Sequence, residues 1–525
     1  MGIYFNPNNE SFSKDRYSKI YIDKTELLDY LNGEIGTNGN CIAVSHARRF
    51  GKSHAAGMID AYYSRGCDSS ELFKDTQISF SEKFEKYMNQ YNVIHLDVSS
   101  LWDDFKSNIV EKIQEYILDD LKECFEGAVD FSKKFSVVLM SIYKITKIPF
   151  VIIIDEWDCI IRNSNDQKLI HQYLQFLHSL FKSEESKSFL ALAYITGILP
   201  IKKIKDESAL NNFREYTMLD SYPIAKYFGF TEDEVKTLCE EYGMDFETIR
   251  TWYNGYLIDG LHMYNPNSVA LAMERKKVSA YWKNTSSFLS INTFITMNYS
   301  GLKDDVLRML SGGKVFVNTE TFGNDLFEIS SKDEALTALI HLGYLAYDEE
   351  EGCAYIPNYE VASAYQSALN KGSWSEIAQS ISRCDELLRA TIQQDADKVA
   401  QIIELAHEAY TSVLKYNDEN SLSCVLTMAY FTAPAYYNVV REFPTGKGYA
   451  DFAFIPRKNA GNRPAMIVEL KYNQSADSAI AQIKERKYQG ALAGYEEKVL
   501  LVGVNYDAEG KESKKHTCVI EEWNK

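Results

Sequence analysis

The sequence contains no long apolar segment. Nowhere in its 525 residues do 18 or more apolar residues follow one another, whereas a helix needs about 20 to cross a bilayer. The first 19 residues are polar and lack the apolar centre of a secretory signal. We therefore expect a cytoplasmic protein without a membrane partner.

Closely spaced cysteines are also missing. The nine cysteines are scattered singly between Cys41 and Cys518, and none forms a CxxC pair. Disulfide frameworks and structural zinc sites use even or closely spaced sets of cysteines. The pattern indicates free, buried thiols in a reducing compartment. The alternative, a redox-sensing cysteine, needs a thiol that its surroundings activate.

Basic residues are too scarce for a protein that binds nucleic acid over its whole surface. The formal net charge is −18. Residues 441–525 hold 14 Lys+Arg against 12 Asp+Glu, a net charge of +2, so the other 440 residues carry −20. Because positive charge provides most of the affinity for phosphate backbones, we expect any nucleic-acid site near the C-terminal end.

Four short apolar runs in the first 200 residues predict a parallel β-sheet. They cover residues 40–45, 92–98, 149–154 and 189–196, and amphipathic segments such as 105–124 and 167–181 lie between them. Strands that alternate with helices are typical of an α/β fold with helices on both faces of a parallel sheet.

The rest of the chain changes character twice. Helical patterns dominate from about residue 226 to 300, and residues 331–370 predict a helix, two short strands around an acidic turn, and a second helix. That order suggests a winged helix, although a helix followed by a hairpin is common in other folds. The last segment alternates again, with strands at 449–456, 465–472 and 498–506 and a helix at 476–493.

A phosphate-binding motif follows the first predicted strand. Residues 46–53, HARRFGKS, match G-x-x-x-x-G-K-[ST] except at the first glycine. The backbone N–H groups of such a loop cradle a phosphate, the lysine reaches the β- and γ-phosphates, and the serine hydroxyl ligates Mg²⁺. The candidate nucleotide-binding residues of this loop are His46, Arg48, Arg49, Gly51, Lys52 and Ser53.

Polar residues end two further strands of the predicted sheet. Asp155 and Glu156 follow the run 149–154, and Thr196 ends the run 189–196. In P-loop ATPases an aspartate at this place holds the Mg²⁺ shell, and a glutamate can polarise the attacking water. We expect Thr196 to sense the γ-phosphate. The three pieces in this order predict a site for ATP and Mg²⁺, with Glu156 as a catalytic residue and Arg214 as a candidate arginine finger.

These motifs together resemble a known family. HARRFGKS, a strand ending in DEWD, ITGILPIKK, FGFTEDEV, WYNGY, MYNPNSV and YWKNTS occur in this order, and the sequence is similar to the AAA-ATPase-like family of bacterial proteins over about residues 1–290. The resemblance implies a P-loop ATPase fold in which the first glycine of the loop is usually replaced. The chain departs from the family at His46-Ala47, where Arg-Pro is usual, and at Trp157, where Tyr is usual.

A second constellation lies near the C-terminus. Asp451 begins one predicted strand, and Glu469 and Lys471 end another, where a spacing of two residues puts them on one face. Two carboxylates can hold a divalent cation while a lysine orients or activates water. Gln482 follows on the next helix. The order resembles the PD-(D/E)XK nuclease core, which commonly follows the ATPase-like domain in this family, and Glu419 is a weaker candidate for a further acid.

The complete prediction is an α/β protein with a P-loop parallel sheet, a helical, winged-helix-like middle and a PD-(D/E)XK-like C-terminal domain. The expected domains are residues 1–225, 226–300, 301–372 and 373–525. The expected metal ligands are Ser53, Asp155, Asp451 and Glu469, and the expected partner is nucleic acid, with DNA favoured over RNA. Two alternatives stay open: an ATP-gated binding switch whose nuclease fold does not cut, and a nucleotide-binding scaffold without a nucleic-acid role.

Overall fold

The computed structural model describes most of the chain. The described residues are 2–201, 210–282, 291, 294, 299, 301–323, 329–369, 383–411, 419–444, 448–457, 462–488, 492, 498–510 and 515–523. They form two compact units, the first made of Met1–Thr237, Gly255–Ala270 and Val317–Gly352 and the second of Leu238–Asn254, Leu271–Phe316 and Cys353–Lys525. Each unit is described by itself below.

The first unit is built on a parallel sheet of five strands. Its order is β2-β3-β4-β1-β5, so β4 lies between the first strand and β3. The strands are β1 (Cys41–Ser45), β2 (Asn92–Asp97), β3 (Phe150–Asp155), β4 (Leu190–Gly197) and β5 (Arg214–Thr217). Four of them confirm the predicted strands. The edge strand β5 was missed, because two of its four residues are charged and the other two carry a hydroxyl, so its apolar signal is weak.

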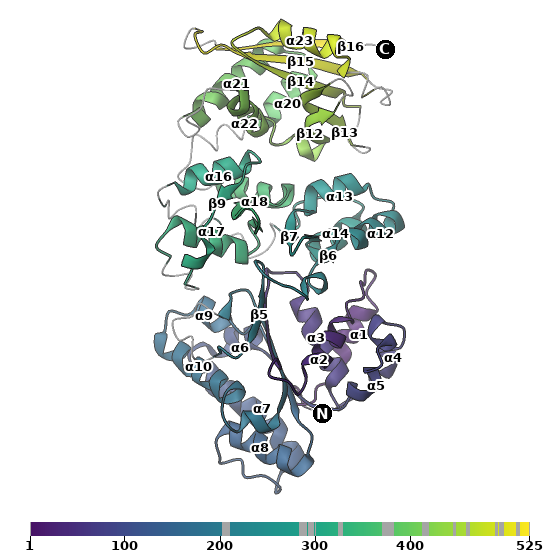
Figure 1. Ribbon diagram of the computed structural model, residues 1–525, viewed down its shortest axis with the longest axis vertical. Coiled ribbons are helices and arrows are strands. Elements are labelled where there is room, and N and C mark those ends of the chain that lie inside the picture. The colour runs from purple at the N-terminus through teal and green to yellow at the C-terminus, as the bar shows by residue number, and fades with distance from the viewer. Residues whose placement is uncertain are drawn as a thin grey trace. The chain divides into compact units, whose positions relative to one another are not determined.

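Two hydrophobic cores lie on the two faces of this sheet, because successive strand residues point to opposite sides. One face is covered by α1–α5 and the other by α6–α10 (Figure 1). The first set is α1 (Glu10–Arg16), α2 (Leu27–Glu34), α3 (Lys52–Tyr63), α4 (Ser70–Phe73), η1 (Gln77–Phe80) and α5 (Phe84–Tyr87). The second is α6 (Val98–Phe105), η2 (Lys106–Asn108), α7 (Ile109–Phe125), α8 (Phe135–Thr146), α9 (Cys159–Asn163), α10 (Gln167–Phe181) and α11 (Ser186–Phe189).

The residues of β3 show how the double burial arises. Val151 and Ile153 belong to the core with α3, whereas Ile152 and Ile154 belong to the core with α7 and α10. All six strand residues are buried, which explains why the sequence is a continuous apolar run rather than an alternating one. Each fully buried aliphatic side chain contributes roughly 1.5–3 kcal/mol, so this strand anchors the acidic pair that follows it.

A small antiparallel sheet and several short elements complete the first unit. The sheet has the order β6-β8-β7, with β6 (Phe230–Thr231), β7 (Tyr256–Ile258) and β8 (Leu261–Tyr264). The unit also holds η4 (Ala225–Tyr227), η6 (Thr319–Thr321), α17 (Lys332–His341) and β10 (Ala346–Asp348). Two helices, α12 (Glu232–Tyr242) and α14 (Pro266–Arg275), begin in the first unit and end in the second.

The predicted helix–strand–strand–helix order of residues 331–370 is present. It consists of α17, β10, β11 (Cys353–Tyr355) and α18 (Tyr359–Leu369), and β11 pairs with β9 (Val315–Phe316) in the second unit. The second unit also contains α13 (Phe246–Tyr253) and α16 (Leu302–Leu310). The four-domain division and the winged-helix identity of this region stay predictions.

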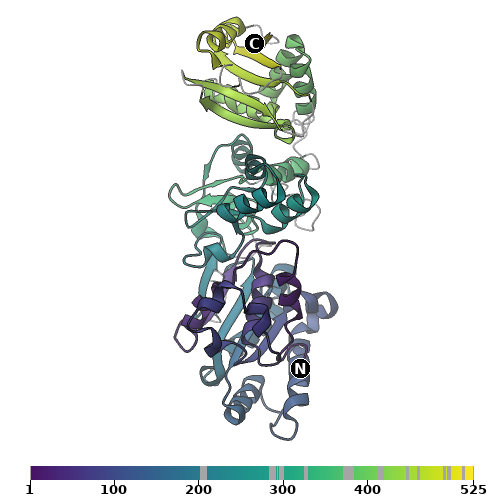
Figure 2. The same ribbon diagram turned by 90° about the vertical axis from the view of Figure 1, so that its right-hand side faces the viewer.

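The C-terminal part of the second unit is a mixed sheet with helices on both sides. Its order is β12-β13-β14-β15-β16, in which only β14 and β15 are parallel. Figure 2 shows the strands between α23 on one side and α20–α22 on the other. The elements are α20 (Cys384–Ile392), α21 (Ala396–Thr411), α22 (Glu419–Ala429), η7 (Ala433–Ala435), β12 (Tyr437–Pro444), β13 (Tyr449–Pro456), β14 (Ala465–Tyr472), α23 (Ala476–Glu485), β15 (Val499–Tyr506) and β16 (His516–Trp523).

The predicted strands at 449–456, 465–472 and 498–506 are confirmed. The helix predicted for 476–493 is shorter, because the α-helix ends at Glu485, and part of 486–493 lies outside the described residues. A capping box between Ser475 and Ser478 fixes the start of this helix. Within the parts of the chain that the structure describes, no helix is both long and apolar enough to cross a membrane.

Candidate functional site

The carboxyl ends of the central strands in the first unit bring the predicted ATP-site residues together. Val44 pairs with Thr196, and Ile154 pairs with Ile195, so β1, β3 and β4 end at the same edge of the sheet. The Thr196 hydroxyl donates to the Asp155 carboxylate, and the N–H of Glu156 donates to the same Asp155 carboxylate at 3.1 Å. Residues about 40 positions apart in sequence therefore share one polar cluster.

His46 is placed in the core of the first unit rather than on the loop surface. Its side chain is fully buried, its Nε2 lies 2.7 Å from the Ser221 hydroxyl, and its ring contacts Phe228. Burial lowers the pKa of His46 to about 3, with a smaller effect of the Lys52 charge, so the ring is neutral. Any contribution of His46 to a phosphate site would therefore come from its backbone.

The unusual backbone angles of the loop fall on other residues. Gly51 has φ +90° and Arg49 has φ +67°, whereas His46 has no positive φ. The missing first glycine therefore imposes no left-handed conformation on His46. Arg49 is exposed and Arg48 is half-buried, which leaves the Arg49 guanidinium available to an anion at the loop.

Lys52 is the most buried charge of the loop. Its side chain is 4% exposed, and its Nζ donates to the carbonyl oxygens of His46 (2.9 Å) and Ala47 (3.0 Å). Burial lowers the pKa of Lys52, and the nearby carboxylates of Glu156 and Asp155 oppose that shift. The ammonium group is thus held over the loop, where an incoming phosphate could replace the two carbonyl contacts.

A divalent cation would find hydroxyl and carboxylate oxygens at this end of the sheet. Ser53 is exposed at the first turn of α3, and Asp155 is buried at the end of β3. Mg²⁺ in nucleotide sites is typically held by one or two protein oxygens, phosphate oxygens and water. The donor set of Ser53 and Asp155 fits that chemistry.

Glu156, the predicted catalytic base, is held by a buried arginine. Arg162 forms an ion pair with Glu156, and its Nε donates to Asp158 at 2.8 Å. Asp158 is fully buried and also accepts the N–H groups of Ile198 (3.1 Å) and Leu199 (2.8 Å). Burial raises the pKa of Glu156, and the Arg162 charge is the main opposing influence. Glu156 itself has φ +52°, a sparsely populated conformation for a non-glycine residue.

Asp158 and Arg162 were not predicted from the sequence as site residues. Side chains four residues apart meet on one face of a helix. This spacing is the one feature of the sequence that could have suggested an ion pair between Asp158 and Arg162. Its meaning depended on the position of Glu156, which only the fold provides.

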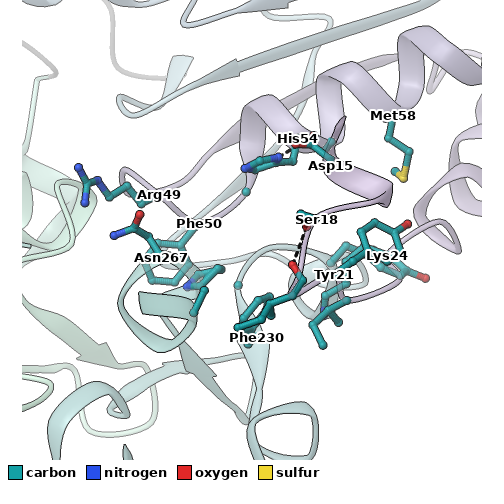
Figure 3. Close-up of a pocket in the computed structure, with 18 of the residues that line it drawn as sticks. Asp15, Ser18, Tyr21, Lys24, Arg49, Phe50, His54, Met58, Phe230 and Asn267 are labelled. Atoms are coloured by element: carbon teal, nitrogen blue, oxygen red, sulfur yellow. Dashed lines mark hydrogen bonds and ion pairs between the residues drawn. The ribbon is translucent and has the colours of Figure 1, made fainter. Parts of the chain in front are cut away.

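A cavity of about 350 Å³ lies beside the phosphate-binding loop, entirely within the first unit. Figure 3 shows Arg49, Asn267 and Phe50 next to one another on one side, with His54 and, across from it, Tyr21 and Phe230. Most of the lining is apolar, and His54 forms an ion pair with Asp15 at 2.6 Å on its wall. An aromatic and apolar cavity next to a phosphate-binding loop is suited to a flat heterocycle attached to phosphates.

Arg214 does not lie near this edge of the sheet. It pairs with Ile42, near the start of β1, whereas the loop follows the end of β1. Its guanidinium forms an ion pair with Glu34 at 2.7 Å. Within one chain, Arg214 therefore cannot act as an arginine finger on a phosphate bound by the loop.

The second unit brings together the four predicted residues of the carboxylate–lysine constellation. Lys471 Nζ lies 3.3 Å from Glu469 Oε1, and the side-chain amide of Gln482 donates to the same carboxylate. Asp451 accepts the N–H of Leu470 at 2.7 Å, which fixes it beside the strand that carries Glu469. Two strands and one helix thus supply a single cluster. Glu419 begins α22, but its side chain lies outside the described residues.

Glu469 carries the clearest electrostatic signal of this cluster. The residue is 3% exposed, and its Oε2 has no hydrogen-bond partner. Burial and then the Asp451 charge raise the pKa of Glu469 to about 7, while Lys471 opposes the shift. A buried carboxylate oxygen without a donor, next to a second carboxylate, is an environment that a divalent cation would stabilise.

No group of three or more His, Cys, Asp or Glu side chains arranged for a metal ion occurs among the described residues. Two carboxylates nevertheless fit Mg²⁺, which commonly keeps several water ligands and binds proteins through one or two carboxylates. Asp451 and Glu469 would be those ligands.

Two separate segments of the chain match known family models. Residues 10–205 match the family model described as "Predicted AAA-ATPase", and residues 417–516 match that of the PD-(D/E)XK nuclease superfamily. The resemblance seen in the sequence extended further, to about residue 290. A protein of Azotobacter chroococcum mcd 1, described as "Uncharacterized protein in vnfD 5'region", is 28% identical over 141 residues, which are 26% of this chain and 27% of that protein. The chain thus matches only about a quarter of the length of this relative.

Several solved structures show a remote likeness. The replication initiator DnaA bound to AMPPCP and single-stranded DNA has 10% identity and a TM-score of 0.27, covering 71% of this chain and 93% of that one. The ORC1 protein of Aeropyrum pernix in complex with DNA has 11% identity and a TM-score of 0.28, covering 88% and 96%. TM-scores of this size are too low to support a conclusion about this chain. The family matches, in agreement with the parallel and mixed sheets, show that the protein joins a predicted AAA-ATPase segment of P-loop fold to a C-terminal PD-(D/E)XK nuclease-superfamily domain.

Proposed function

We propose that the protein binds and hydrolyses ATP in its first unit and cleaves nucleic acid, DNA rather than RNA, with its C-terminal domain. The observation that carries the proposal is the cluster of Asp451, Glu469, Lys471 and Gln482. These residues come from β13, β14 and α23, and the Glu469 carboxylate accepts from both Lys471 and Gln482. A chance Glu–Lys pair on a strand would not also recruit an amide and a second carboxylate.

In the C-terminal site Asp451 and Glu469 would hold Mg²⁺, which polarises the scissile phosphate and lowers the pKa of a bound water. Lys471, 3.3 Å from Glu469, is placed to orient that water or to stabilise negative charge on the phosphate. Gln482 keeps the Glu469 carboxylate in position.

In the ATP site the loop 46–53 and Lys52 would bind the phosphates, and Ser53 with Asp155 would hold Mg²⁺. Thr196 is hydrogen-bonded to Asp155, so it is placed to respond to the occupant of the phosphate site. Glu156 would polarise the attacking water, and the paired Arg162 would favour the ionised form of its carboxylate. The apolar cavity beside Phe50 would take the base.

The test is cleavage of DNA and RNA by the full chain with Mg²⁺ or Mn²⁺, with and without ATP. We expect cleavage by the wild type and a loss of roughly 10²–10⁴-fold in Lys471→Ala, the range for removing one acid–base group. Lys484→Ala is the matched control, because Lys484 lies on α23 and pairs with Glu521 instead.

Two results would replace the proposal with an alternative. Nucleic-acid binding that survives Glu469→Ala, without cleavage by the wild type, would identify an ATP-gated binding switch. Nucleotide binding without any salt-dependent binding of DNA or RNA would identify a nucleotide-binding scaffold.

A further inference from the structure

An exposed aromatic side chain stands beside the carboxylate–lysine cluster. Tyr449 begins β13, two residues before Asp451, and is 66% exposed. Along this strand Tyr449 is exposed, Ala450 is fully buried and Asp451 is partly buried, so Tyr449 and Asp451 share the open side. Exposing the apolar part of a tyrosine ring to water does not stabilise the fold. The neighbouring Ala450, not Tyr449, belongs to the hydrophobic core.

A cation is connected to the same end of β13. Arg486 is exposed, and its Nη1 donates to the Tyr488 hydroxyl at 3.0 Å. The Tyr488 hydroxyl also lies 3.5 Å from the amide nitrogen of Gln482, which in turn donates to Glu469. A chain of contacts thus runs from the buried carboxylate outward to an arginine at the surface.

Gly448 keeps Tyr449 close to that arginine. It has φ +142°, and a Cβ on it would stand 3.1 Å from Arg486 Nη1 and 3.2 Å from the Tyr488 hydroxyl. The backbone just before Tyr449 is therefore packed directly against the Arg486–Tyr488 pair. Two exposed side chains, those of Tyr449 and Arg486, therefore start from neighbouring stretches of backbone close to the cluster.

We propose that Tyr449 and Arg486 form a subsite for an unpaired nucleic-acid strand, in which the Tyr449 ring stacks on a base and Arg486 binds the adjacent phosphate. The inference rests on the proposed function and narrows its substrate class to single-stranded segments or frayed ends. An exposed ring can stack only on a base whose face is free, which a base inside a duplex does not offer. A single ring and a single arginine also suit the small net charge of residues 441–525 better than an extended duplex-binding surface.

The experiment measures binding of a fluorescein-labelled single-stranded oligonucleotide and of its duplex to the full chain by fluorescence anisotropy. Ca²⁺ replaces Mg²⁺ to slow cleavage, and cleavage with Mg²⁺ is followed in parallel. We expect the wild type to prefer the single strand and Tyr449→Ala to bind it about tenfold more weakly, the effect of one lost aromatic–base stack. Tyr449→Phe should bind like the wild type, because the ring rather than the hydroxyl stacks.

Tyr436→Ala is the matched control. Tyr436 is 37% exposed and precedes β12, at the opposite end of the β12–β13 hairpin from Tyr449. Tyr436→Ala should leave binding of the single strand unchanged. Arg486→Gln should weaken binding of the single strand and reduce the dependence of that binding on salt concentration.

Equal binding of single strand and duplex, or unchanged binding by Tyr449→Ala, would overturn the subsite. The proposed function would survive that result if cleavage still depended on Lys471. Absence of all nucleic-acid binding by the folded wild type would overturn both.

Discussion

Lys52 and Glu469 are both buried ionisable groups of candidate sites, but their surroundings differ. Lys52 donates to two carbonyl oxygens, and the acids near it are themselves paired, Asp155 with Thr196 and Glu156 with Arg162. Glu469 has one oxygen without a partner and a second carboxylate beside it. Lys52 and the two acids nearest to it therefore already have polar partners, whereas one oxygen of the buried Glu469 carboxylate has none.

This difference indicates what each site requires from its ligand. A nucleotide must replace contacts that already exist, so its binding energy is spent partly on breaking them. A divalent cation at Asp451 and Glu469 would supply a partner that the protein lacks. Five predictions test this comparison, from the largest expected effect to the smallest.

Lys52→Ala should weaken ATP binding by roughly 10- to 100-fold, because charged hydrogen bonds contribute about 1.5–3 kcal/mol. Isothermal titration calorimetry with a non-hydrolysable ATP analogue measures the effect. Lys112→Ala is the control, since Lys112 lies on α7 and pairs with Glu115 at the surface. Unchanged affinity in Lys52→Ala would show that the loop does not bind phosphate.

Metal binding at the C-terminal site should weaken as the pH falls below about 7. The pKa of Glu469 is raised to about 7, so its proton competes with the cation below that pH, by up to tenfold per pH unit for one proton. Mn²⁺ titrations at several pH values measure this, and Glu469→Gln should remove the pH dependence.

The same pKa sets the sign of a stability effect without metal. Because the folded pKa of Glu469 lies above its ordinary value of 4.5, the folded state holds a proton that the unfolded state has lost between these values. Stability should therefore fall as the pH rises through this window, and added Mn²⁺ should reverse the loss. Chemical denaturation at several pH values measures the free energy of unfolding. A free energy that did not fall across this window would contradict the raised pKa of Glu469.

Arg162→Gln should move the acid limb of ATP hydrolysis to higher pH. Arg162 is the main charge that lowers the pKa of Glu156, so its loss leaves a carboxylate that is protonated at higher pH. The kcat against pH, measured beside nucleotide affinity, separates this from a binding defect. Arg162→Lys retains the positive charge, so its acid limb should lie between those of the wild type and Arg162→Gln. A pH profile that is unchanged in Arg162→Gln would show that Glu156 is not the base.

His46→Gly restores the usual first glycine of the loop, and it should destabilise the protein rather than improve the site. The neutral ring of His46 fills the core and bonds to Ser221, so we expect a loss of roughly 1–3 kcal/mol in the free energy of unfolding. Chemical denaturation measures it, with Ser221→Ala as a smaller comparison. A higher ATP affinity in His46→Gly would contradict the view that His46 serves the hydrophobic core rather than the phosphate site.

The sequence alone was sufficient for the motifs and the strands that carry them. Buried strands such as 150–155 are continuous apolar runs, and polar residues that end such runs mark the edge of the sheet where ligands bind. The Lys52–Ser53 and Glu469–Lys471 pairs were visible for the same reason, since each depends on neighbours in sequence. Their proposed roles await the experiments above.

The tertiary structure decided the contacts between distant residues. Only strand order places Thr196 on Asp155, and only packing puts His46 into the core and Arg162 on Glu156. Arg214 followed a suggestive motif, but parallel pairing with the start of β1 places it at the wrong end of the sheet. Local patterns report propensity and burial, whereas the charge state of Glu469 depends on which groups the fold leaves within a few ångströms of it.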